Sequence, residues 1–81
     1  MKMYELTPTN GRKSFHHKAL VQIDDDGTET LISYTTPIMH RYKDGRIVRL
    51  WDGWGVTTGT HIAAFCGMKK AEFLALPLDV K

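Results

Sequence analysis

The sequence predicts an α+β fold: a small twisted antiparallel β-sheet of about four or five strands, with one or two short C-terminal helices packed on it. Three observations support this fold class. Two pairs, Asp26-Gly27 and Asp44-Gly45, each separate runs of alternating residues, which is a strong hairpin signal. Strand-forming residues dominate the first two thirds of the chain. After Trp51 the apolar residues recur at helical spacing.

The first hairpin is expected to follow a short edge strand, Lys2–Leu6. Alternation over residues 15–24 predicts the next strand, and Asp26-Gly27 predicts its turn. A two-residue loop gathers apolar side chains on one face of the hairpin, so we expect that register. It sets Asp24 opposite Glu29, a repulsion that a three-residue loop avoids. The expected pairs are Ile23 with Thr30, Val21 with Ile32 and Ala19 with Tyr34.

The second hairpin is expected around Asp44-Gly45. Pro37 divides the run before it into two segments, Leu31–Thr36 and Ile38–Lys43, with a bend between them. Both faces of this hairpin are mixed, as expected if a helix covers one face and the other is partly solvated. The expected pairs are Tyr42 with Ile47, His40 with Arg49 and Ile38 with Trp51.

The helices are expected after the turn at residues 52–55. The first, His61–Cys66, ends at Gly67. Thr57 and Thr58 precede it and offer hydroxyl groups for an N-cap, and His61 can exchange hydrogen bonds with those hydroxyls. We therefore expect these three residues to form a structural cap. A second helix, roughly Lys69–Leu76, is stopped by Pro77.

Composition favours a single globular domain, residues 1–81, because 42% of the residues are hydrophobic and 25% are charged. The net charge of +2 is small for a nucleic-acid-binding protein, so charge alone does not select that partner. Cys66 is the sole cysteine, which excludes an intramolecular disulfide and fits a reducing compartment. The sequence has no apolar run long enough to span a membrane, and its first residues lack the apolar segment of a signal peptide, so we expect neither feature. We expect a cytoplasmic protein without membrane contact.

Catalytic and metal-binding patterns are missing from the sequence. No CxxC, HxxxH or HExxH spacing occurs, and the adjacent His16 and His17 point to opposite faces of a strand. The acidic run at residues 24–26 lacks the alternating acids of a calcium loop. His61 and Cys66 diverge by about 140° around a helix, which excludes a dyad within that helix. We therefore expect no metal, no cofactor and no enzymatic activity; an enzyme centred on His61 is the most distant alternative.

Nucleic-acid binding is the stronger alternative. Cations alternate with aromatic residues around the second hairpin, as in proteins that stack single-stranded bases and contact phosphates. However, acidic turns lie in the same region, and long basic side chains also protect sheet edges. The candidate binding residues are His40, Arg41, Arg46 and Arg49.

Protein binding is the favoured function. Trp51 and Trp54 flank Asp52-Gly53, a turn too short to bury both rings easily, and tryptophan is enriched at interface hot spots. Trp51 continues a strand and is expected in the core, whereas Trp54 is expected to be partly exposed and is the candidate contact. We expect a small non-enzymatic binding protein whose partner is another protein or a second copy of the chain.

A family resemblance rests on the order of several short motifs. Thr-Thr-x-x-His-Ile-x-x-Phe, at residues 57–65, follows Arg12-Lys13-Ser14-Phe15 and the run at residues 33–37. This order resembles short uncharacterised proteins encoded by Gram-positive bacteria and their phages and plasmids. The chain departs from the pattern at Gly55, where serine is usual, and at residues 16–17, where an aromatic–glycine pair is usual. The resemblance implies a small accessory protein of a mobile element or its host, without a known activity.

Overall fold

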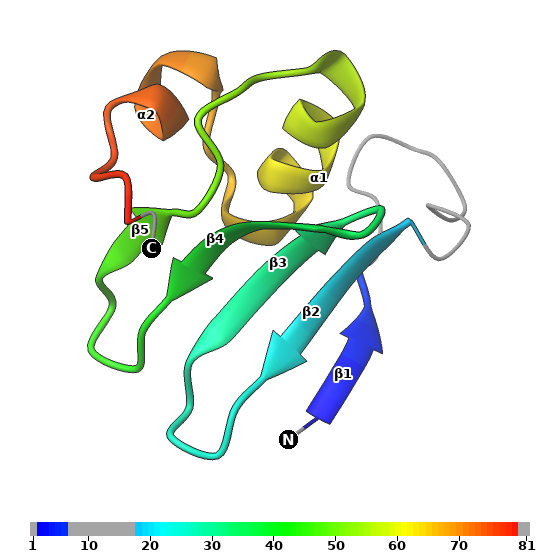
Figure 1. Ribbon diagram of the computed structural model, residues 1–81, viewed down its shortest axis with the longest axis vertical. Helices are drawn as coiled ribbons and strands as arrows, with labels where there is room; N and C mark the ends of the chain where they lie inside the picture. The colour runs from blue at the N-terminus through cyan, green and yellow to red at the C-terminus, as the bar shows by residue number, and fades with distance from the viewer. Residues whose placement is uncertain (1, 7–17, 80–81) are drawn as a thin grey trace.

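The computed structural model describes residues 2–6 and 18–79, and it confirms the α+β fold (Figure 1). Five antiparallel strands lie side by side in their sequence order, and two short helices follow them. The beginning of the strand predicted over residues 15–24, the His16-His17 pair and the motif at residues 12–15 lie outside the described residues. The strands are β1 (Lys2–Glu5), β2 (Ala19–Ile23), β3 (Glu29–Ser33), β4 (Thr36–Arg41) and β5 (Ile47–Arg49), and the helices are α1 (Val56–Cys66) and α2 (Lys70–Leu74).

Both Asp-Gly hairpins contain three-residue loops, so the predicted two-residue loops are wrong. In the first loop, the Asp24 backbone N–H donates to the Thr28 carbonyl at 2.9 Å, and the Asp24 carbonyl accepts from the Gly27 N–H at 3.0 Å. Gly27 and Gly45 end the two loops with φ of 89° and 93°, the left-handed conformation that a three-residue hairpin requires at this position. The aspartate before each glycine stabilises the turn: Asp26 Oδ1 accepts from the Thr28 backbone N–H at 2.9 Å, and Asp44 does the same for Arg46 at 3.0 Å.

The longer loops move every predicted cross-strand pair by one residue. Val21 lies opposite Leu31 rather than Ile32, and His40 lies opposite Val48 rather than Arg49. Because side chains alternate between faces, His40 and Arg49 therefore lie on opposite faces of the sheet. The corrected pairs are Ile23 with Glu29, Ala19 with Ser33, Met39 with Arg49 and Arg41 with Ile47.

A further hairpin, which the sequence did not reveal, joins β3 to β4. Its loop is Tyr34-Thr35, and Tyr34 adopts a φ of 58°. Pro37 lies inside β4, so the predicted break at this residue is wrong. The proline is tolerated because it adjoins a β-bulge, where Ile38 is the extra residue of β4. The bulge allows the neighbouring Ile38 and Met39 both to be buried.

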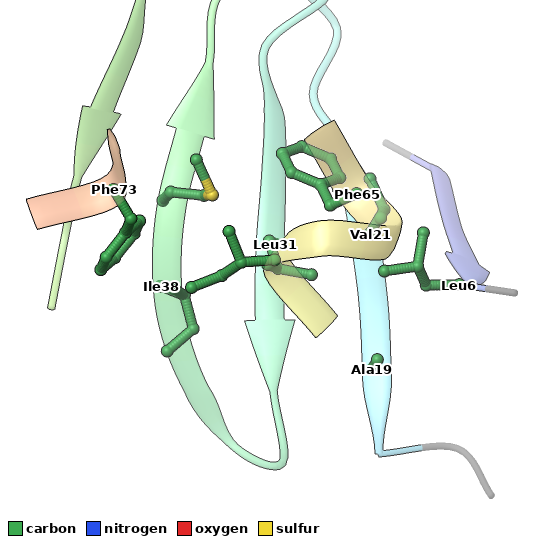
Figure 2. Close-up of a cluster of buried hydrophobic side chains, with 9 residues drawn as sticks. Leu6, Ala19, Val21, Leu31, Ile38, Phe65 and Phe73 are labelled. Atoms are coloured by element: carbon green, nitrogen blue, oxygen red, sulfur yellow. The ribbon is translucent and has the colours of Figure 1, made fainter. Parts of the chain in front are cut away.

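Both helices cover the same face of the sheet. By the observed pairing, Ser33, Arg41 and Arg49 lie on this face; Ser33 contacts α1, Arg41 contacts Phe65 of α1, and Arg49 contacts Phe73 of α2. Figure 2 shows the apolar side chains that fill the space between the layers. Burial of each large side chain contributes about 1.5–3 kcal/mol. The core comprises Leu6, Ala19, Val21, Leu31, Ile38, Met39, Ile62, Phe65 and Phe73.

The outer edge of β5 is protected by the end of the chain. Arg49 donates its backbone N–H to Pro77 O and accepts from the Asp79 N–H, both at 2.7 Å. Leu78 thereby forms a parallel bridge with Arg49. These bonds satisfy backbone groups that an open edge strand would leave unpaired. They also bring the segment after α2 back to the sheet, which fixes α2 beside α1 (Figure 1).

Candidate binding groove between the helices

Helix α1 begins at Val56, five residues before the predicted start, so the predicted threonine cap is wrong. The N-cap residue is Gly55, which has no side chain to bond the first turn. Thr57 and Thr58 instead lie within that turn. The helix ends as predicted, at Gly67, whose φ of 77° is left-handed. Helix α2, Lys70–Leu74, is shorter than predicted.

Thr58 and His61 bind the sheet rather than the helix terminus. They are three residues apart, so both project toward β3. There, Ser33 Oγ lies 3.2 Å from Thr58 Oγ1 and 2.8 Å from His61 Nδ1. Ser33 and His61 are only 2% and 1% exposed. Such an enclosed network ties α1 to the sheet, because a buried polar group that loses its partner is costly.

Arg41 lies beneath α1, where its charge is already engaged. Its Nε donates to Glu29 Oε1 at 2.9 Å, its Nη1 donates to the Phe65 carbonyl at 3.2 Å, and its guanidinium lies 4.3 Å from the centre of the Phe65 ring. The hydrogen bond with Glu29 raises the pKa of Arg41, so the guanidinium stays protonated. Arg41 therefore joins β4 to both β3 and α1.

Arg49 has a corresponding position beneath α2. Its Nε donates to the Leu76 carbonyl at 3.0 Å, and its guanidinium lies 5.8 Å from the centre of the Phe73 ring. Arg41 and Arg49 thus face the layer interface rather than a common outer surface.

The remaining basic candidates lie elsewhere. His40 is on the sheet face opposite the helices, with Nδ1 2.7 Å from Thr30 Oγ1. Its ring centre is 5.9 Å from that of Tyr42, and the Arg46 guanidinium lies 4.8 Å from the Tyr42 ring centre. Arg46 is exposed and pairs with Asp44 at 3.2 Å. The structure therefore brings His40 and Arg46 together, around Tyr42, but separates them from Arg41 and Arg49.

The two tryptophans are both half-buried and packed against the core. Each indole lies on a glycine. A Cβ atom added at Gly53 would come within 2.6 Å of Trp51 Cζ2, and one added at Gly59 would come within 2.4 Å of Trp54 Cζ2. The Trp54 ring also lies 5.8 Å from the Phe73 ring, centre to centre. Trp54 therefore bridges α1 and α2, a role that the sequence did not reveal.

A groove of about 400 Å³ lies beside Trp54, between α1 and the start of α2. Its apolar lining includes Val56, Ala63 and Met68, and Lys69 and Lys70 add two positive charges. Val56 is 88% exposed, the most open large apolar side chain among the described residues. The groove was not predicted from the sequence, because α1 begins five residues before its predicted start. The sequence does contain one indication of this surface: Val56, Thr60 and Ala63 are spaced by four and three residues, so they share one face of a helix.

Metal and membrane features can be assessed for residues 2–6 and 18–79. No cluster of three or more His, Cys, Asp or Glu side chains there could hold a metal ion. Neither α1 nor α2 has the length and apolar character of a membrane-crossing helix. Burial raises the pKa of the half-buried Cys66 thiol, so the less nucleophilic protonated form is favoured.

Comparison with known proteins identifies the family. The sequence model of a family of unknown function, DUF8033, matches residues 4–74. Because the match spans most of the chain, the protein belongs to this family. The searches found no matching curated protein and no matching solved structure.

Proposed function

We propose that this member of the DUF8033 family is a non-enzymatic protein-binding module that receives a segment of another protein in the groove between α1 and α2. The observation that carries this proposal is the pairing of a half-buried indole, Trp54, with the almost fully exposed Val56 at one groove. Aromatic anchors flanked by exposed apolar side chains are typical of interface hot spots.

The open shape of the groove favours a protein segment over a small molecule. Small-molecule sites bury most of the ligand surface. Here the lining residues Val56, Ala63, Lys69 and Lys70 are all exposed. Such a wall can contact one side of a long partner but cannot enclose a compact ligand. An amphipathic helix that lays its apolar face into a hydrophobic groove is a recurring mode of protein recognition.

The biological setting is proposed from the sequence resemblance. Short proteins of Gram-positive bacteria, phages and plasmids carry motifs in a similar order. We infer an accessory protein of a mobile element or its host, acting in the cytoplasm. The partner is then a protein of the host or of the same element.

Single-stranded nucleic acid is a second candidate ligand, and the contacts among His40, Tyr42 and Arg46 support it. An aromatic ring beside a guanidinium can stack a base and contact a phosphate. This surface lies on the face opposite the groove, so the two functions use separable residues. Arg41 and Arg49 add little to it, because both are engaged beneath the helices.

The test is recovery of partners from nuclease-treated host lysate by wild type and two matched variants. Ala63→Arg fills the groove, whereas Ala75→Arg makes the same change at the exposed C-terminus of α2. A specific partner, purified after identification, should bind wild type and Ala75→Arg but not Ala63→Arg. Binding that survives Ala63→Arg, or that requires nucleic acid, contradicts a protein-docking groove.

A further inference from the structure

The charge at the groove is positive and lies on one side only, at the start of α2. The outer stripe of α1 is uncharged, so the charge comes from Lys69 and Lys70 at the entry to α2. The nearest acid in sequence, Glu72, points its carboxylate at the helix start, where Oε1 accepts the Lys69 backbone N–H at 3.1 Å. Within the described part of the chain, neither lysine ammonium lies at ion-pair distance from a carboxylate. Among residues 2–6 and 18–79, these two cations thus border an apolar surface without a carboxylate at ion-pair distance.

The shape of the α1 wall suits a helix. Val56, Thr60 and Ala63 are spaced by four and three residues, which forms a straight stripe about 10 Å long at 1.5 Å per residue. Ala63 is small and exposed, so a second helix can approach this part of α1 closely, toward the usual interaxial distance of about 8–10 Å. Met68 closes the stripe with a flexible side chain that adapts to different apolar anchors.

We propose, on the basis of the protein-binding function above, that the groove binds an amphipathic helix whose apolar stripe is flanked by acidic residues. Two or three apolar side chains of that helix contact Trp54, Val56 and Met68, and its carboxylates pair with Lys69 and Lys70. Apolar burial supplies most of the affinity. The exposed charges select an acidic partner and raise its association rate, and salt screens them.

The test is selection from a displayed library of helical peptides, randomised at the stripe positions i, i+3, i+4 and i+7 and at the flanking positions. The intact protein is the target, and Ala63→Arg is used for counter-selection. Enriched peptides should carry acidic flanking residues. Their affinity should fall roughly tenfold when Lys69 and Lys70 are both changed to Glu, and it should weaken as salt rises. Lys43→Glu, at an exposed hairpin loop, is the matched control and should have little effect.

The outcomes separate the two proposals. Peptides that require the open groove but carry neutral or basic flanks overturn the acidic-helix inference and leave the protein-binding function intact. If no groove-dependent peptide is enriched, both proposals fail. Decanoate serves as a small-amphiphile probe in the same samples. Suppose that decanoate changes tryptophan emission in wild type but not in Ala63→Arg, and that no peptide binds the groove. The groove is then a small-molecule site, and both proposals are overturned.

Discussion

The Trp54 indole lies against Gly59 so closely that a Cβ atom at position 59 would be 2.4 Å from Trp54 Cζ2. This contact couples the fold to the groove, because the same indole packs on Phe73 and lines the groove. A glycine inside a helix costs about 1 kcal/mol relative to alanine. Here the cost is offset by the space that it provides for the ring.

Gly59→Ala should therefore destabilise the protein by about 1–3 kcal/mol, although alanine is the better helix former. Urea unfolding measures the change. A double-mutant cycle supplies the control: in a Trp54→Leu background the clash is absent, and Gly59→Ala should become neutral or stabilising. An equal cost in both backgrounds would show that the ring contact is not the cause.

The buried network between β3 and α1 gives a second prediction. Ser33→Ala removes the hydroxyl that contacts both Thr58 and His61, and it should cost about 1–3 kcal/mol because buried polar atoms lose a partner. Thr58→Val should also destabilise. Thr57→Val is the matched control, since Thr57 is exposed on the same turn. Denaturant melts in which Thr57→Val costs as much as Thr58→Val would indicate a general effect on the helix.

The left-handed loop glycines give a third prediction. Gly27→Ala and Gly45→Ala should each lower stability by about 1–2 kcal/mol, the cost of a left-handed non-glycine residue. Gly27→Ala should be the more costly, because its Cβ would lie 3.3 Å from Lys43 Cδ, whereas nothing lies within 4 Å at Gly45. Asparagine tolerates this conformation better and should restore part of the loss. Thermal melts that do not distinguish alanine from glycine would contradict the left-handed conformation of these two glycines.

The turn aspartates give a fourth prediction, on pH. Backbone N–H groups of Thr28 and Arg46 hold the pKa values of Asp26 and Asp44 below the ordinary 3.8. A depressed folded-state pKa contributes stability above the unfolded pKa, and that contribution is lost as pH falls through the folded pKa. Thermal stability should therefore decline below about pH 4. Asp26→Asn with Asp44→Asn keeps an acceptor oxygen but does not titrate, so its decline should be shallower. Identical slopes would exclude these carboxylates as a cause.

The sequence predicted the fold class well because its two strongest signals are local. Asp-Gly pairs identify hairpins, and the change from alternating to helical spacing identifies the helical end of the chain. The register was wrong because Asp-Gly occurs in both two-residue and three-residue loops. The repulsion expected between Asp24 and Glu29 was the physical indication of the longer loop. Apolar pairing does not distinguish the two loop lengths, because Leu31 opposite Val21 satisfies it as well as Ile32 would.

The candidate site was less predictable because it is formed by contacts between residues that are distant in sequence. The sequence pattern indicates that Arg41 and Arg49 are exposed cations. In the structure, each guanidinium instead contacts an aromatic ring of a helix and donates to a backbone carbonyl that is distant in sequence. Thr58 was predicted to cap the helix, but its hydroxyl forms a hydrogen bond with the Ser33 hydroxyl on β3. Trp54 was identified as the candidate contact. Its groove depends on the early start of α1 at Val56 and on the turn at Gly67, which sequence spacing did not bring together.

The most direct test of the docking groove is an NMR titration of the uniformly ¹⁵N-labelled protein with the partner segment that it captures. If the partner occupies the groove, the largest shifts should occur at the Trp54 indole N–H and at the backbone amides of Ala63 and Lys69. The amides of Thr30, His40 and Arg46, on the opposite face and its hairpin, should stay unchanged. Largest shifts at His40 and Arg46 with an unmoved Trp54 indole would contradict docking in the groove and identify the opposite face as the binding surface.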